Sequence, residues 1–156
     1  MAAGGKPHSS GSVGVSVPHE RTGVRIARHA FADQLEAAGV PPEDRDDAML
    51  VLSELVSNAV KHAAPLPSGE ITVRWEVRDD LLHIETTDGG GGTRPHPSVP
   101  VLSALGGRGL DIVRTVSSQW GVTEDNDTVT VWAEVPRTPL DLDRAAAPDL
   151  TSQASN

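Results

Sequence analysis

The chain has 156 residues, the usual size of one domain, and its 37% apolar and 22% charged residues are typical of a soluble globular protein. Its net charge of -9 disfavours nucleic acid as a partner, because contacts to phosphates require clusters of Lys and Arg. It contains no cysteine, which excludes disulfides, thiolate zinc sites and cysteine nucleophiles. No signal peptide and no run of about 20 apolar residues is visible, so we expect a cytoplasmic protein without membrane contacts.

The first half of the chain predicts a strand followed by two helices. Residues 1–11 are rich in Gly, Ser and Ala, which predicts a flexible tail. Residues 12–17 alternate small or polar side chains with valine, as in a strand. Apolar residues then recur at helical spacing over residues 24–38, and Gly39 is suited to end this helix. A second helix opens with two prolines and an acidic turn and continues to residue 63.

The second half of the chain predicts two hairpins separated by a glycine-rich stretch and a short helix. Alternating apolar residues over 71–87, interrupted by two aspartates, predict the first hairpin. Residues 89–107 hold most of the mid-chain glycines and several prolines, and such stretches inside a compact domain are usually functional or disordered. A short helix then starts near Gly109, and residues 120–135 predict the closing hairpin.

This order of elements predicts an α+β fold rather than a doubly wound parallel sheet, in which helices would alternate with strands. We expect a two-layer α/β sandwich, with a mixed, mostly antiparallel sheet that carries its helices on one face. One domain would cover residues 12–136, and residues 137–156 would form a second flexible tail.

Polar residues share one side of the second predicted helix. Glu54, Asn58 and either Lys61 or His62 are spaced at helical intervals. Asn is a mediocre residue for a helix interior, and its side-chain oxygen can ligate a hard cation such as Mg²⁺. Glu54, one turn earlier, could accept a proton from a water or a hydroxyl group. The alternative is an ordinary solvated face, which accounts for Glu54 and Lys61 better than for Asn58.

A second candidate lies where the first hairpin ends. Asp88 closes an apolar strand and is followed by four glycines. It is either a turn residue or a buried carboxylate that accepts a hydrogen bond from the exocyclic amine of a base. Gly90 and Gly92 would let the backbone approach a ligand closely, because no Cβ intervenes.

A third candidate is the segment Gly106-Gly107-Arg108-Gly109-Leu110, which directly precedes the short helix. Backbone N–H groups at the N-terminus of a helix, together with the helix dipole, form a site for phosphate. Arg108 could add charge-assisted hydrogen bonds. A flexible linker into a helix is the alternative.

These three segments resemble the motifs of one family. Residues 52–63 look like the N-box of the GHKL ATPase/kinase superfamily, in particular of its anti-sigma-factor serine/threonine kinase branch. Residues 88–92 are similar to its D-x-G-x-G box, and residues 107–113 resemble its G-x-G-L box. The three boxes occur in the family's order, and the resemblance covers residues 12–136.

The resemblance implies a Bergerat-type sandwich that binds ATP with Mg²⁺. Asn58 would bind Mg²⁺ and bridge to the phosphates, Asp88 would recognise adenine, and Glu54 would be the general base. Residues 89–107 would contain the lid that closes over ATP. A threonine, either Thr128 or Thr130, would join the adenine contact. The other nucleotide contacts would come from Gly90, Gly92, Gly107, Arg108, Gly109 and Leu110.

Three functions follow from these residues and this resemblance. An anti-sigma-type serine/threonine kinase would use Glu54 to activate a serine on an anti-anti-sigma partner. A non-catalytic, ATP-gated module would instead sequester a sigma factor or another regulator. A histidine-kinase fragment is disfavoured, because the sequence shows no helix pair with a phospho-accepting histidine. The resemblance favours protein partners and is compatible with a homodimer.

Overall fold

The computed structural model describes residues 11–91 and 108–138, with the backbone alone for residues 108–110. The two predicted tails fall almost entirely outside these ranges, as does the predicted lid from residue 92 to residue 107. The described elements follow the predicted order. They are β1 (Val13–Pro18), α1 (Arg21–Ala37), α2 (Pro42–His62), β2 (Glu70–Val77), β3 (Leu81–Asp88), α3 (Arg108–Val116), β4 (Gln119–Asp125) and β5 (Thr128–Pro136).

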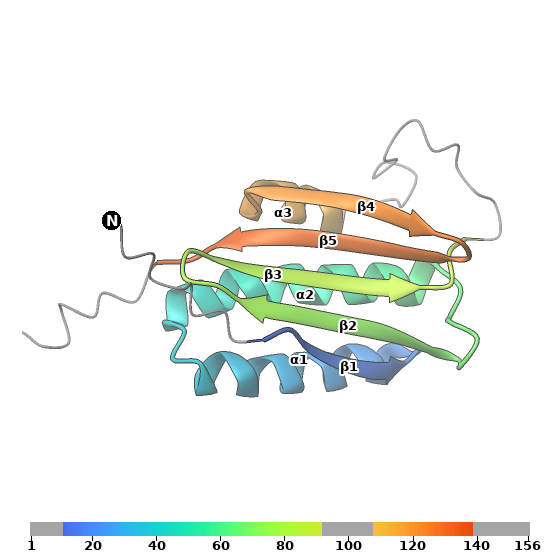
Figure 1. Ribbon diagram of the computed structural model, residues 1–156, viewed down its shortest axis with the longest axis horizontal. Coiled ribbons are helices and arrows are strands. Elements are labelled where there is room, and N and C mark those ends of the chain that lie inside the picture. The colour runs from blue at the N-terminus through green and yellow to red at the C-terminus, as the bar shows by residue number, and fades with distance from the viewer. Residues whose placement is uncertain (1–10, 92–107, 139–156) are drawn as a thin grey trace, which may run out of the picture.

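The five strands form one sheet in the order β1-β2-β3-β5-β4 (Figure 1). Every neighbouring pair is antiparallel. The sheet that we expected to be mixed is therefore purely antiparallel among the described strands. For β2–β3 and β4–β5 the reason lies in the connections, since tight turns join these strands and only antiparallel strands can be joined in this way. The segment containing α3 then brings β5, rather than β4, against β3.

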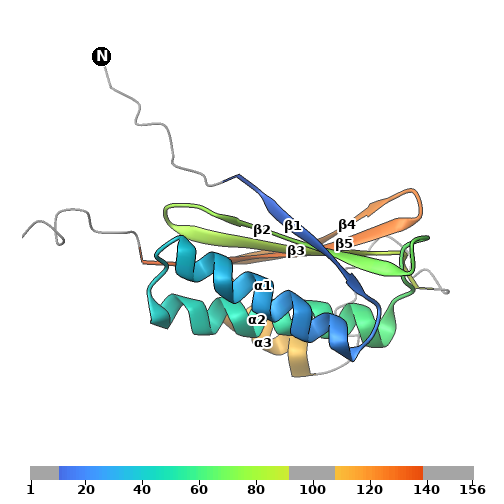
Figure 2. The ribbon, with the colours of Figure 1, turned by 90° about the horizontal axis from the view of Figure 1, so that it is seen from below.

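All three helices lie on the same face of the sheet (Figure 2). α1 packs on β1 and β2, α2 packs on β3 and β5, and α3 contacts α2 and β4. The opposite face carries no other element among the described residues. The predicted two-layer α+β sandwich with helices on one face is therefore confirmed.

Aliphatic side chains fill the space between the two layers, as the scarcity of aromatic residues predicts. The buried stripe of α2 faces the inward side chains of the central strands. Phe31 and Trp75 meet edge to face in this core, with ring centroids 5.2 Å apart. Burial of each large apolar side chain contributes about 1.5–3 kcal/mol. No helix in the described ranges has the length and apolar character needed to cross a membrane.

Two backbone hydrogen bonds join the end of α2 to the end of β3. The N–H of Ala64 donates to the carbonyl oxygen of Gly90 at 2.7 Å, and the N–H of Gly89 donates to that of Ala64 at 2.8 Å. These bonds bring two segments together that lie far apart in the sequence. The polar positions of α2 and the turn after Asp88 therefore meet at one end of the molecule.

Candidate functional site

Asp88 lies on the helix-covered face of the sheet, at the last position of β3. Side chains alternate along this strand, and the buried ones are Leu82, Ile84, Thr86 and Asp88. The side chain of Asp88 occupies an interior position with a residue exposure of 4%, where an apolar residue is the usual choice. A buried carboxylate at the end of a strand is a candidate for binding rather than a solvated turn residue.

Only one oxygen of the Asp88 carboxyl group is hydrogen-bonded to a described residue. Its Oδ1 accepts a hydrogen bond from the N–H of Gly90 at 2.7 Å, whereas its Oδ2 has no hydrogen-bond partner among the described residues. Burial raises the pKa of Asp88, and the bond from Gly90 and the charge of His19 offset this increase in part. The buried residue Asp88 therefore presents one carboxyl oxygen to the donor of a ligand.

The two glycines after Asp88 allow this turn to form against the end of α2. A Cβ at Gly89 would lie 2.2 Å from the carbonyl oxygen of Pro65, so no larger residue fits there without moving the backbone. Gly90 has a φ of 79°, in the left-handed region that favours glycine. Gly92, the other glycine predicted to contact the ligand, lies outside the described residues.

Glu54 and Asn58 lie one turn apart on α2, and both are half-buried rather than fully solvated. The side-chain nitrogen of Asn58 is buried and has no hydrogen-bond partner. Glu54 forms no hydrogen bond or ion pair with any residue in the described ranges. Buried polar atoms in folded proteins are almost always hydrogen-bonded, so an unpartnered amide next to a free carboxylate indicates a ligand site.

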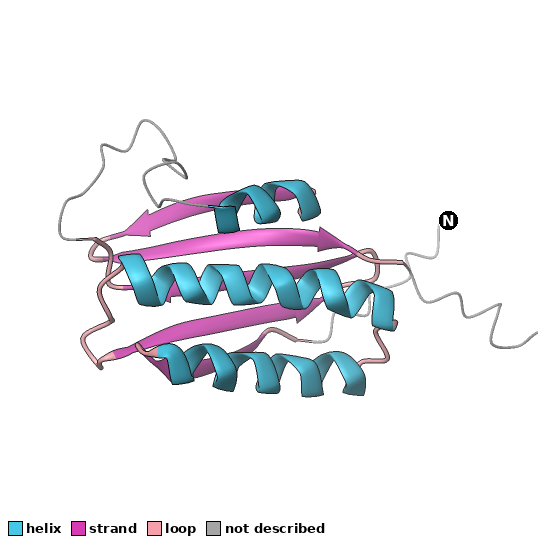
Figure 3. Cartoon of the chain, turned by 180° about the vertical axis from the view of Figure 1, so that it is seen from behind, coloured by secondary structure: helices cyan, strands magenta, loops and turns pink. Residues whose placement is uncertain are grey.

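The N-terminus of α3 lies at the same end of the helical layer as the last turns of α2 (Figure 3). α3 begins at Arg108, one residue before the predicted start, and packs against α2. The backbone of Arg108, Gly109 and Leu110 forms its first turn, whose N–H groups have no partner within the helix. The side chains of these residues and all of Gly107 lie outside what the structure describes.

Thr86 was not predicted as a site residue, yet it shares the buried face of β3 with Asp88. It is fully buried, and its hydroxyl group has no hydrogen-bond partner. The signal for it was present in the sequence, because a period of two along β3 places residues 86 and 88 on the same face. We therefore add Thr86 to the candidate site.

His19 is a second residue that the sequence did not reveal. It follows β1 and its Nε2 donates to the carbonyl oxygen of Ala59 on α2 at 3.0 Å. Its charge also lowers the pKa of Asp88, which opposes the effect of burial. No local pattern could have indicated this contact, because the two residues of the hydrogen bond are 40 positions apart.

Neither of the threonines predicted to contact adenine lies on the face of Asp88. Asp88 pairs with Val129, so the alternation along β5 places Thr128 and Thr130 on the opposite face. Thr130 hydrogen-bonds to Thr87 there at 2.7 Å, and Thr128 donates to the carbonyl oxygen of Asp125. The expectation was wrong because the strand register, which sets the face, is not visible in the sequence.

These groups together fit a nucleotide. Asp88 supplies an acceptor for an amine, Asn58 and Thr86 supply buried polar groups that lack partners, and α3 supplies a helix N-terminus. α2 packs on β3 and α3 packs on α2, so the elements that carry these groups are in contact with one another.

Comparisons with known proteins agree with this geometry. The chain is 30% identical to the serine-protein kinase RsbW of Bacillus velezensis over 130 residues, which cover 75% of this chain and 80% of that protein. It is 27% identical to RsbW of Listeria innocua over 114 residues, covering 65% of this chain and 73% of that protein.

Two solved structures have a similar fold. The crystal structure of the RsbU and RsbW domains of Rv1364c from Mycobacterium tuberculosis matches 83% of this chain and 34% of that chain, with a TM-score of 0.62 and 17% identity. The SiaB–SiaC complex from Pseudomonas aeruginosa matches 80% of this chain and 89% of that chain, with a TM-score of 0.55 and 16% identity.

The family comparison covers nearly all of the sandwich. Residues 17–134 match the family described as the histidine kinase-like ATPase domain, which extends from the end of β1 into β5. This span contains every candidate site residue named above. The resemblance to GHKL proteins is confirmed, and the chain belongs to the histidine kinase-like ATPase family.

Proposed function

We propose that the chain is an ATP-dependent serine/threonine protein kinase of the anti-sigma type, which uses Mg²⁺ and phosphorylates an anti-anti-sigma partner. Asp88 carries the nucleotide part of this proposal, because the residue is buried and its Oδ2 is free, among the described residues, to accept a hydrogen bond from the exocyclic amine of adenine. Similarity to the RsbW serine-protein kinases supports the transfer reaction. The SiaB–SiaC complex, to which this chain is similar in fold, supports a protein as the partner.

The residues around Asp88 would hold the rest of the nucleotide. Within the described ranges, no three His, Asp or Glu side chains come together to hold a metal ion. Asn58 would ligate Mg²⁺ through its side-chain oxygen, together with phosphate oxygens and water, a ligand set that this cation favours. When bound, Mg²⁺ neutralises charge on the phosphates. Gly107, Arg108, Gly109 and Leu110 would bind phosphate at the N-terminus of α3, and Gly90 and Gly92 would border the base.

Glu54 would act as the general base. It would accept the proton of the partner's serine hydroxyl as the serine oxygen bonds to the γ-phosphorus. The bond between that phosphorus and the β–γ bridging oxygen breaks, and ADP leaves with the bridging oxygen. A carboxylate without a competing hydrogen bond suits this role, and Glu54 has none from the described residues.

Nucleotide binding is tested by thermal unfolding with ATP and ADP at millimolar concentration, with and without Mg²⁺. Any ligand that prefers the folded state raises the melting temperature, by an amount equivalent to about 2.7 kcal/mol at one hundred times its Kd. Asp88→Asn should lose most of this response. Asp79→Asn, at an exposed turn at the other end of β3, is the matched control and should respond like the wild type. A wild type that does not respond to ATP contradicts the proposal.

Phosphoryl transfer is tested separately, with small anti-anti-sigma-like proteins encoded in the same genome as substrates. We expect Glu54→Gln to keep ATP binding and to lower the transfer rate by a factor of about 10²–10⁴. Glu43→Gln, in the exposed first turn of α2, should leave the rate unchanged. If ATP binds but no candidate is phosphorylated, the chain is a non-catalytic module that sequesters a sigma factor or another regulator.

A further inference from the structure

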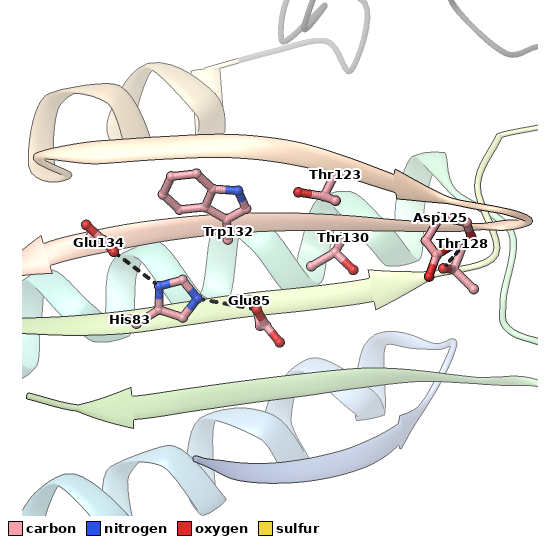
Figure 4. A pocket seen from close by; sticks show the side chains of 8 residues that line it. All are labelled: His83, Glu85, Thr123, Asp125, Thr128, Thr130, Trp132 and Glu134. Atoms are coloured by element: carbon pink, nitrogen blue, oxygen red, sulfur yellow. Dashed lines mark hydrogen bonds and ion pairs between the residues drawn. The ribbon is translucent and has the colours of Figure 1, made fainter. Parts of the chain in front are cut away.

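The face of the sheet opposite the helices is polar, with a tryptophan near its centre. A shallow pocket of about 460 Å³ lies over β3, β5 and β4 on this face (Figure 4). Its lining includes His83, Glu85, Asp125, Trp132 and Glu134. Asp88 and the ATP-binding groups proposed above lie on the other side of the sheet. This pocket is therefore separate from the candidate nucleotide site.

The indole of Trp132 lies across β5 onto β4 (Figure 4). Gly121 is its direct neighbour on β4, and a Cβ at that position would lie 2.7–2.9 Å from three atoms of the indole. The sequence thus leaves room for the ring at this one position of β4. On the side of β3, the ring stacks with His83 at a centroid distance of 5.9 Å and an angle of 21°. The indole is therefore contacted by a residue of β4 and by a residue of β3.

Two half-buried carboxylates lie beside this ring. Glu85 Oε2 is 3.3 Å from His83 Nε2, and Glu134 Oε1 is 3.5 Å from His83 Nδ1, so both acids share one imidazole. Glu134 Oε1 is also 3.5 Å from Arg78 Nη1. Arg78 is shared with a second carboxylate, because its Nη2 is 3.1 Å from Glu76 Oε2. Among the described residues, Glu85 forms an ion pair with His83 alone, although Arg74 lies opposite it on β2. The lining of the pocket contains the carboxylates of Glu85, Asp125 and Glu134 and, as its basic group, the imidazole of His83.

We infer that this pocket binds an arginine side chain presented by a basic segment of another protein. Trp is the most favourable aromatic residue for a cation, and a planar guanidinium can stack on it while it bonds to carboxylates at its edge. Glu85 pairs directly with Trp132 across β3 and β5, and Glu134 is two residues from Trp132 on the same strand. Carboxylates and an indole face thus occur at neighbouring positions on one surface.

The charges of this pocket favour an arginine over phosphates and over apolar segments. Phosphates of a nucleotide or a nucleic acid would be repelled by Glu85, Glu134 and Asp125. A purely apolar segment would leave the half-buried carboxylates desolvated and without a partner. A second copy of this chain could supply exposed arginines from α1, and the experiment below distinguishes that outcome.

The test uses short peptides and the indole N–H resonance of Trp132 in a ¹H–¹⁵N correlation spectrum, assigned with Trp132→Phe. A tryptophan-free peptide with two arginines is compared with the same peptide in which citrulline replaces arginine, since citrulline keeps the shape and removes the charge. We expect the arginine peptide to shift this resonance in a saturable and salt-dependent manner. The citrulline peptide should have little effect. Combined Glu85→Gln and Glu134→Gln should weaken binding about tenfold.

Glu124→Gln is the matched control, because Glu124 is exposed on β4 but alternates to the other face of the sheet. It should bind the arginine peptide like the wild type. The single variants Glu85→Gln and Glu134→Gln replace the double variant if the latter does not fold. Equal shifts with arginine and citrulline, or binding that survives loss of both carboxylates, contradict the inference. It is also overturned if the protein alone is a dimer that Glu85→Gln and Glu134→Gln convert to a monomer, because the occupant is then a second copy.

Discussion

Asp88 is where stability and the proposed function oppose each other. The carboxyl group is buried, and burial raises its pKa because the charged form loses hydration. Without a nucleotide, Asp88→Asn should therefore raise the free energy of unfolding at neutral pH, and with it the melting temperature. The variant should be more stable than the wild type without ATP and less stable than the wild type with saturating ATP.

The same residue predicts a pH dependence of stability. The folded pKa of Asp88 is raised above its ordinary value of 3.8, so the folded protein holds this proton more tightly than the unfolded chain does. The stabilising contribution of the protonated group is full below the unfolded pKa and is lost as the pH rises through the folded pKa. The advantage of Asp88→Asn over the wild type should therefore grow with pH and then level off. Urea unfolding of both proteins at a series of pH values measures this difference in the free energy of unfolding. A difference that does not change with pH contradicts the raised pKa of Asp88.

At the scale of single residues, the sequence revealed part of the candidate site. Asn58 and Asp88 were found because their chemical types are unusual for their positions in a helix and a strand, and Glu54 was found because it lies one turn before Asn58. Thr86 could have been found from the alternation along β3. His19 could not, because its contact with Ala59 depends on how the chain folds over 40 residues.

At the scale of the element, α2 combines a packing face with a polar flank. Its buried side chains face the sheet, whereas Asn58 leaves a buried nitrogen without a partner. Ala has a higher helix propensity than Asn, by about 0.5–0.7 kcal/mol. Asn58→Ala should therefore make the nucleotide-free protein slightly more stable, and it should also remove the part of the ATP response that requires Mg²⁺.

A neighbouring position provides the control for this prediction. Ser57 is half-buried on the same turn of α2, and Ser57→Ala gains helix propensity in the same direction. It should keep the full response to ATP and Mg²⁺ in thermal unfolding. If Asn58→Ala also keeps that response, Asn58 does not ligate the metal ion.

The elements themselves were easier to predict than their register. Periods of 3.6 and 2 in the apolar residues gave the helices and strands in the correct order, because each element buries one face. The pairing of Asp88 with Val129 depends on contacts between distant strands, and no local pattern contains it. This explains why Thr128 and Thr130 were assigned to the wrong face of the sheet, whereas the strand that contains Thr130 was predicted correctly.

At the scale of the whole molecule, the sheet separates two surfaces with different chemistry. The helix-covered side holds Asp88 and the unpartnered groups of Asn58 and Thr86. The open side holds Trp132 with the carboxylates around it. An acidic chain with a net charge of -9 repels ATP at long range, so the proposed nucleotide site would depend on local donors such as the N-terminus of α3. The open face, in contrast, uses the same acidic character to attract a cation.

This separation predicts that the two sites can be removed independently. The variant with Glu85→Gln and Glu134→Gln should keep the melting-temperature increase that ATP causes in the wild type, because neither side chain reaches the helix-covered face. In turn, Asp88→Asn should bind the arginine peptide with unchanged affinity. Mutations at distant sites without shared partners usually combine additively, to within about 0.3–0.5 kcal/mol. Measuring both ligands on the two variants and on their combination tests this directly. A combined effect larger than that margin would show that the central strands transmit a signal between the nucleotide and the partner.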